Sequence, residues 1–159
     1  MNTEQLNFFM RRAIELSRIG MENGQGGPFG AIIVKNNQII AEGYNQVIAT
    51  NDPTAHAEIV AIRKACQNLN SFQLNDCILF TSCEPCPMCM GAIYWARPKA
   101  VYFANTRKDA AEIGFDDEFI YQELAVPIER RTIPMYQILV PEAKKVFLLW
   151  KNKPNKTLY

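Results

Sequence analysis

The sequence is poor in histidine, with His56 as the single one among 159 residues. Catalysis by paired histidines is therefore excluded, and so is any zinc site built on two or three imidazoles. A metal centre that needs a nitrogen ligand has only His56 to supply it. The remaining ligands of such a centre must be of another residue type.

An excess of one charge and long apolar runs are missing as well. Because 17 basic side chains face 16 acidic ones, the chain has no global field that would gather nucleic acid or an anionic membrane. It also lacks an apolar stretch near the roughly 18 residues that span a bilayer, and its first residues do not resemble a secretion signal. We expect one cytoplasmic domain over residues 1–159, with no membrane partner.

Cysteine is present, but not in the pattern of a disulfide framework. The cysteines are odd in number and crowded into one part of a chain that is large enough to form a core without crosslinks. We therefore expect the thiols to stay reduced. The five positions are Cys66, Cys77, Cys83, Cys86 and Cys89.

Apolar periodicity and turn residues predict alternating helices and strands. Asn36-Asn37 separates two β-rich runs and predicts a hairpin, while Asp52-Pro53 and Pro85 mark helix starts. The predicted helices cover about residues 3–22, 52–66, 85–97 and 141–151, with an acidic loop-and-helix region at 105–125. The predicted strands cover 30–35, 38–43, 77–81, 101–104 and 135–140, of which 77–81 and 101–104 are expected to be buried. This order implies a three-layer α/β fold, in which a mixed five-stranded sheet carries helices on both faces.

Two short segments concentrate residues suited to metal binding and proton transfer: His56-Ala57-Glu58 and Pro85-Cys86-Pro87-Met88-Cys89. Cys86 and Cys89 are three residues apart at a predicted helix start, so they share a face and can bind one ion. The free N–H groups of that first turn stabilise thiolates. His56 would be the third ligand, and a tetrahedral zinc with three protein ligands keeps one position open for water, as catalytic sites do.

Charge and placement point to Glu58 as the residue that moves a proton. One neutral imidazole and two thiolates cancel the two positive charges of the ion, so ionising a bound water costs less than in solution. Glu58 follows His56 by two residues, over which an ideal helix turns by about 200°. The two side chains therefore converge only if the metal lies beyond the helix end, which a cap at Asp52-Pro53 permits.

Each segment alone has a simpler interpretation. A lone histidine is commonly a core or surface residue. A single Cys-x-x-Cys after a strand also fits a thioredoxin-like redox pair, with Ile133-Pro134 as the opposing proline. The redox hypothesis leaves His56-Ala57-Glu58 unexplained, and a non-catalytic zinc module leaves Glu58 without a role. The occurrence of both segments at predicted helix starts favours a catalytic zinc.

The pattern His56-x-Glu58 followed by Pro85-Cys86-x-x-Cys89 resembles the signature of the cytidine-deaminase-like zinc nucleobase deaminases. More narrowly, the sequence is similar to the small bacterial guanine deaminases in residues 26–30, 51–58, 81–89, 94–98 and 114–117. The resemblance covers nearly the whole chain. It implies the cytidine deaminase-like fold, one zinc ion per chain on His56, Cys86 and Cys89, and hydrolysis of guanine to xanthine and ammonia in purine metabolism.

The same resemblance implies roles for further residues. Attack at guanine C2 would be accompanied by proton transfer through Glu58, and Asp117 would accept from the purine edge and relay a second proton. The remaining implied substrate contacts are Asn45 as a hydrogen-bond partner, Phe29 as a stacking ring, Trp95 as a pocket wall, and Ala57. From the residues alone, Phe29 and Trp95 also fit a core, Asn45 fits a turn, and Asp117 fits a solvated cap.

The resemblance further implies a homodimer that exchanges its C-terminal segments, here about residues 141–159. Such an exchange would bring the terminal Tyr159 into the neighbouring subunit's site.

A tRNA adenosine deaminase is the main alternative within this chemistry, because those enzymes share much of the Cys-Pro-Met-Cys segment. Residues 107–131 carry four basic and seven acidic side chains, a net charge of −3 in the segment expected to border the pocket. This charge repels a polyanion but not a neutral base. Five lysines between residues 144 and 156 are typical of a solvated surface. We therefore expect guanine as the substrate and no nucleic-acid partner.

Overall fold

The computed structural model describes residues 1–158, and Tyr159 lies outside the described residues. The chain divides into a first unit, Met1–Asp117, and a second unit that begins at Glu118. Within residues 1–158, no helix combines the length and the apolar character that crossing a membrane requires.

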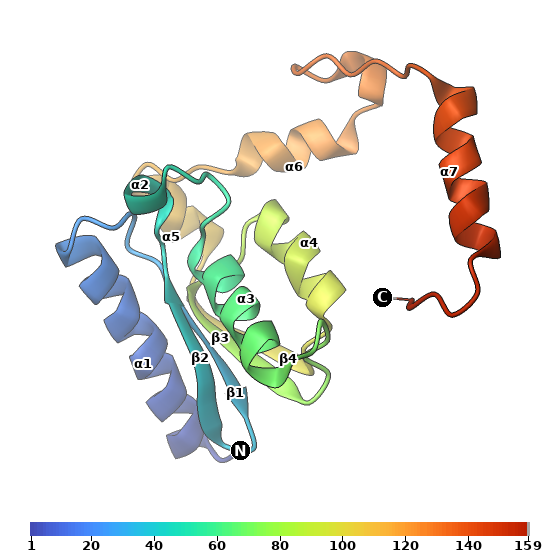
Figure 1. Cartoon of the computed structure of the whole chain (residues 1–159). Helices are drawn as coiled ribbons and strands as arrows, with labels where there is room; N and C mark the ends of the chain where they lie inside the picture. The colour runs from blue at the N-terminus through green and yellow to red at the C-terminus, as the bar shows by residue number, and fades with distance from the viewer. Residues whose placement is uncertain (159) are drawn as a thin grey trace. The chain divides into compact units, whose positions relative to one another are not determined.

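A mixed sheet forms the centre of the first unit (Figure 1). Its strands are β1 (Gly30–Lys35), β2 (Gln38–Tyr44), β3 (Cys77–Cys83) and β4 (Ala100–Asn105), in the order β2-β1-β3-β4. β1 pairs antiparallel with both β2 and β3, whereas β3 and β4 run parallel. Asn36 and Asn37 form the predicted hairpin turn, with φ of 50° and 60°.

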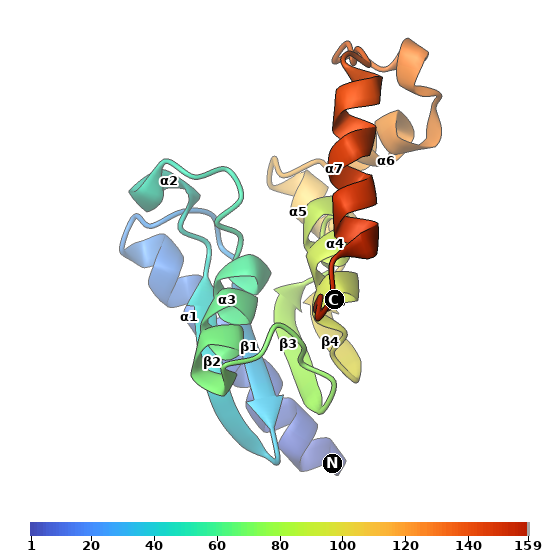
Figure 2. The same cartoon turned by 45° about the vertical axis from the view of Figure 1, so that its right-hand side comes forward.

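Helices cover both faces of this sheet, as the three-layer fold predicts. α1 (Thr3–Glu22) begins at a capping box formed by Asn2 and Gln5 and packs on one face, while α3 (Ala57–Leu69) and α4 (Pro87–Ala96) pack on the other (Figure 2). β1 is buried on both sides because its residues alternate between the two cores. Ile32 and Val34 pack in the core on the α1 side of the sheet, and Ala31 and Ile33 pack in the core on the α3 side.

Two predicted helix starts were wrong by a few residues. α3 begins at Ala57 with His56 as its N-cap, because the carboxylate of Asp52 instead accepts the Thr54 N–H at 2.8 Å and closes a separate turn. α4 begins at Pro87, because a residue that precedes proline avoids the helical region, and Cys86 is extended at φ −66° and ψ 168°. A short helix, α2 (Val47–Thr50), precedes the Asp52 turn.

The predicted fifth strand at 135–140 was also wrong. The described residues form a four-stranded sheet, and residues 132–139 are irregular up to the start of α7 (Val140–Asn152). β4 consequently has β3 as its one neighbour. The expected burial of that strand was wrong too, since Tyr102 and Phe103 are 39% and 48% exposed. Hydrophobic character alone does not distinguish an edge strand from a buried one.

The second unit contains α6 (Glu118–Ala125), a short 3-10 helix (Ile128–Arg130) and α7. Residues 118–158 include no buried side chain. Large apolar side chains are exposed both in the irregular stretch and on α7: Ile133, Met135, Tyr136, Ile138, Leu139, Val146, Phe147, Leu148, Leu149 and Trp150.

Candidate active site

The predicted site residues follow strand ends that meet at one edge of the sheet. The pairing places Gly30 opposite Tyr44, Ala31 opposite Thr81, and Cys83 opposite Asn105. The start of β1 and the ends of β2, β3 and β4 therefore lie together. The segments that flank these ends are 26–29, 45–58, 84–89 and 106–117, and they carry the candidate residues of the first unit except Trp95.

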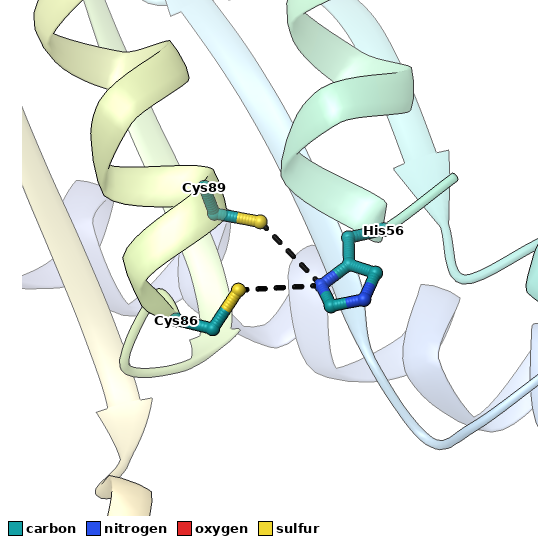
Figure 3. Close-up of side chains that lie close together, drawn as sticks. All are labelled: His56, Cys86 and Cys89. Atoms are coloured by element: carbon teal, nitrogen blue, oxygen red, sulfur yellow. Dashed lines mark hydrogen bonds between the residues drawn. The ribbon is translucent and has the colours of Figure 1, made fainter. Parts of the chain in front are cut away.

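His56, Cys86 and Cys89 converge from two helix N-termini (Figure 3). The Nδ1 atom of His56 lies 3.5 Å from Sγ of Cys86 and 3.6 Å from Sγ of Cys89. His56 and Cys86 are the N-caps of α3 and α4, so their side chains project beyond the helix ends. Cys89 reaches the same point from the first turn of α4. The convergence expected for these ligands is present.

The spacing of these three atoms fits zinc. Zn–S bonds of about 2.3 Å and a Zn–N bond of about 2.0 Å at tetrahedral angles place N and S about 3.6 Å apart. The two observed N–S distances agree with this value, and all three ligand atoms lie within 4.8 Å of one another. One imidazole and two thiolates are also a donor set that zinc prefers.

The surroundings of Cys86 favour the thiolate that binds a metal, whereas those of Cys89 favour the protonated thiol. The interaction of Cys86 with the neighbouring Cys89 side chain lowers the pKa of Cys86 to about 4, with a further contribution from His56. Hydrogen bonding to Cys86, together with burial, raises the pKa of Cys89. Without a cation, the pair is therefore one thiolate and one thiol. A bound Zn²⁺ displaces the remaining proton.

Glu58 lies directly beside the cluster, as predicted. It is 6% exposed, and its Oε2 accepts from Sγ of Cys89 at 3.5 Å. Burial raises its pKa above the ordinary value for a carboxyl group, which brings a carboxyl group towards the range useful for proton transfer near neutral pH. Glu58 and His56 converge because His56 is outside the helix, whereas Glu58 is in its first turn.

Two predicted substrate contacts flank the same edge of the sheet. Asn45 is 4% exposed, and its Oδ1 accepts the N–H of Val47 at 3.2 Å, so the amide NH₂ is the group that remains for a ligand. The backbone N–H of Asn45 donates to the carbonyl of Phe29 at 2.9 Å, which joins these two candidates. Ala57 is fully buried between His56 and Glu58.

The other predicted contacts differ in their placement. Asp117 is half-buried, and burial together with the negative charge on Cys86 raises the pKa of its carboxyl group, so the two are in electrostatic range. Trp95 lies near the end of α4, more than two turns beyond Cys86, and is 63% exposed. Within the first unit, the structure does not bring Trp95 to the cluster of His56, Cys86 and Cys89. Tyr159 lies outside the described residues.

Comparison with known proteins identifies the family. The cytidine and deoxycytidylate deaminase zinc-binding region matches residues 3–105. A guanine deaminase of Bacillus subtilis is 60% identical over 151 residues, which cover 95% of this chain and 97% of that protein. The chain belongs to the guanine deaminases of the zinc-binding deaminase family.

Structural similarity within this deaminase family extends along the chain. The crystal structure of guanine deaminase from Bacillus subtilis superposes on this chain with a TM-score of 0.94 at 59% identity. The aligned region covers 100% of this chain and 99% of the Bacillus subtilis chain. A tRNA-specific adenosine deaminase of Buchnera aphidicola is 39% identical over 109 residues, covering 69% of this chain and 72% of that protein. The similarity to the guanine deaminase therefore includes the C-terminal part of the chain.

Two residues of this deaminase site were not singled out from the sequence. Thr81 is buried in β3, and its Oγ1 donates to Oε1 of Glu58 at 3.3 Å. Phe115 packs edge-to-face on Phe29, with ring centroids 4.9 Å apart. Each lies in a segment that resembles the guanine deaminases, but its partner comes from elsewhere in the sequence. Spacing alone does not reveal such pairs.

Proposed function

We propose that this chain hydrolyses guanine to xanthine and ammonia, using one zinc ion per chain. The observation that carries the proposal is a buried glutamate carboxyl within 3.5 Å of a cysteine in a His-Cys-Cys cluster with zinc-like spacing. Guanine is the substrate of choice because the protein with 60% identity over 95% of the chain is a guanine deaminase. The single cluster found among the described residues supports one ion per chain.

The residues of the site account for the proton transfers of this reaction. When bound, zinc supplies an acidified water that is nucleophilic near neutral pH. Glu58 takes a proton from that water and delivers it to the ring nitrogen next to C2 of guanine. The water oxygen bonds to C2, and Glu58, with Asp117 as a relay, then moves the remaining proton of this new hydroxyl to the amino group as its bond to C2 breaks, so that water and guanine become xanthine and ammonia. Thr81 orients the Glu58 carboxyl through Oε1, while Oε2 faces the ligand cluster.

Recognition of the base falls to the flanking segments. Asn45 offers its amide NH₂ to an acceptor on the ring, Phe29 provides an aromatic face, and Ala57 lies between the ligand and the acid. Asp117 accepts from the purine N–H edge and relays a second proton. Support for Asp117 comes from its position in electrostatic range of Cys86. Trp95 would complete the pocket.

A homodimer completes this proposal. Residues 118–158 bury no side chain and expose an apolar series on and before α7, and exposed apolar surface of this extent marks an interaction site. A second copy of the chain offers a matching partner, because β4 is an edge strand with exposed aromatic residues. In this arrangement, residues 141–159 are exchanged and Tyr159 enters the partner's site. The free state of all five cysteines fits a reducing, cytoplasmic location.

The substrate proposal is tested with purified, zinc-loaded protein. Guanine, adenine, cytosine, cytidine and an adenosine-containing tRNA anticodon stem are offered separately, and released ammonia is measured. We expect turnover of guanine and none of the tRNA stem. If the protein released ammonia from the tRNA stem but not from guanine, the substrate would be tRNA adenosine, and the proposed zinc-dependent deamination would still hold. Metal-free protein that reduces disulfides would replace both with a thiol redox function.

A further inference from the structure

Glu84 lies between β3 and the metal ligands of α4, and it joins two loops of the site. Its backbone N–H donates to the carbonyl of Asn105 at 2.8 Å, and its carboxylate accepts the backbone N–H of Arg107 at 3.0 Å. Sγ of the neighbouring Cys83 donates to the carbonyl of Thr106 at 3.5 Å. Three bonds therefore hold the segment before Cys86 against residues 105–107.

These bonds fix the first turn of α5 (Arg107–Glu112). Thr106 is its N-cap and forms a reciprocal capping box with Asp109, which satisfies the N–H groups of Thr106 and Asp109. The N–H of Arg107 is a further donor that the helix cannot satisfy internally. Glu84 supplies its acceptor, so this helix is capped partly by a residue of the ligand loop.

The segment after α5 carries one candidate substrate contact, Asp117, and the ring partner of another, Phe29. Gly114 leaves the helix with φ of +93°, a conformation that favours glycine, and the N–H of Phe115 returns to the carbonyl of Ala110 at 3.0 Å. The Phe115 ring then packs on Phe29, and Asp117 follows two residues later. A shift of α5 relative to the ligand loop would move both side chains.

We infer that Glu84 is a positioning residue for base recognition: it fixes α5 to the metal-ligand loop and so holds Asp117 at the substrate and Phe115 against Phe29. The inference rests on the proposed function for its substrate. It assigns Glu84 no contact with the base or the ion. Removal of its carboxylate should weaken binding of the purine more than it lowers turnover, and it should leave the metal in place.

The experiment compares full-length, zinc-loaded wild type with Glu84→Ala and Glu84→Gln. KM and kcat for guanine are measured together with the inhibition constant of hypoxanthine, a purine without the reacting amino group. Because a charge-assisted bond is lost, we expect Glu84→Ala to raise KM and the hypoxanthine constant by about tenfold, with a smaller fall in kcat. Glu84→Gln keeps an oxygen that accepts the Arg107 N–H and should recover most of the affinity.

Two controls distinguish a positioning role from a loss of folding or of metal. Zinc content and melting temperature are measured for each variant, and Glu112→Ala removes an exposed carboxylate from the same helix without touching Arg107. If Glu84→Ala does not fold, Glu84→Asp, which is shorter by one methylene, carries the same expectation. Loss of zinc with unchanged KM, or unchanged constants throughout, overturns the positioning role. Failure of the wild type to release ammonia from guanine overturns the proposed function instead.

Discussion

The carboxyl group of Glu58 accepts from the thiol of Cys89 at 3.5 Å, although 31 residues separate them in the sequence. This contact joins the first turn of α3 to the first turn of α4, so one residue that can transfer protons and one that can bind a metal share a buried point. Glu58 does not belong to the three-atom ligand cluster itself. Metal binding and proton transfer can therefore be separated by substitution.

Glu58→Gln should remove activity and keep the metal. Glutamine matches the size of the glutamate side chain and still accepts from Thr81, but it cannot take a proton. We expect kcat for guanine to fall by about a thousandfold, the scale of general acid–base catalysis. Ammonia release and zinc content by atomic absorption check this together. Retained turnover in Glu58→Gln would favour a non-catalytic zinc module.

The ligand set should consist of three residues and exclude Cys83. His56→Ala and Cys89→Ala each remove one of the converging atoms, so both should lose zinc and activity together. Cys83 is the matched control, because burial raises its pKa to about 11 and its thiol donates to Thr106. Cys83→Ala should keep about one zinc per chain. Loss of zinc from Cys83→Ala alone would redefine the ligand set.

The sequence was sufficient to predict both ligand segments, but not their geometry. Both segments do lie at helix N-termini, but α3 begins at Ala57 instead of Asp52-Pro53, and α4 begins at Pro87 instead of Pro85. Asp52 is a residue type that commonly caps a helix N-terminus, but its carboxylate accepts a hydrogen bond from the N–H of Thr54 instead. The pair of Phe29 and Phe115 depends on how four strand ends meet, so no local pattern contains it. The exposure of β4 likewise depends on which strands lie beside it in the sheet, and so does the absence of the predicted fifth strand from the described residues.

The ion pair between Arg12 and Glu42 should make stability depend on pH. Two hydrogen bonds of 2.7 and 2.6 Å from Arg12 lower the pKa of Glu42 and connect α1 with β2. A lowered folded-state pKa means that this stabilisation is fully present above the ordinary pKa of a glutamate. It is lost as pH falls through the lower folded value.

We therefore expect Glu42→Gln to reduce the free energy of unfolding at pH 7 by about 0.5 kcal/mol, because both side chains are over one third exposed. The difference should vanish in acid, at a pH below the lowered folded-state pKa of Glu42, where its carboxylate is protonated. Urea unfolding of metal-free protein at both pH values measures it, since chelation removes the separate effect of zinc loss. Glu112→Gln serves as the control. A difference that persists in acid would point to packing instead of charge.

Gly43 should be necessary for the position of α3. A Cβ atom at this residue of β2 would lie 2.4 Å from the carbonyl oxygen of Ala57 and 2.8 Å from the N atom of Ala61. Since these are backbone atoms, α3 must move, and with it His56 and Glu58. We expect Gly43→Ala to cost about 1–3 kcal/mol of stability and to weaken zinc retention against a chelator.

Gly91→Ala is the matched comparison for that variant. Gly91 lies within α4, and a Cβ atom there would meet nothing within 4 Å. Alanine should therefore stabilise the helix by about 0.5–1 kcal/mol and leave zinc retention unchanged. Thermal unfolding and the rate of zinc transfer to a chelator measure both variants. Equal behaviour of the two would mean that α3 tolerates displacement.

The exposed apolar residues of α7 should be buried in a homodimer. Phe147 and Leu149 are 77% and 72% exposed, and neither has a core to join within residues 118–158. Light scattering should therefore give twice the mass of 18.1 kDa for the wild type. The double substitution Phe147→Ser and Leu149→Ser should shift the protein towards monomer, whereas serine at the exposed Ile14 of α1 should not.

Segment exchange makes a further demand on that dimer, because it places Tyr159 of one subunit in the site of the other. Mixing a His56→Ala chain with a chain that lacks Tyr159 should then restore activity in part: the intact metal site of the second chain receives a tyrosine from the first. Without exchange, each site depends on its own Tyr159, and mixed dimers stay as inactive as their parents. Unfolding and refolding the two chains together, followed by ammonia release from guanine, distinguishes these outcomes.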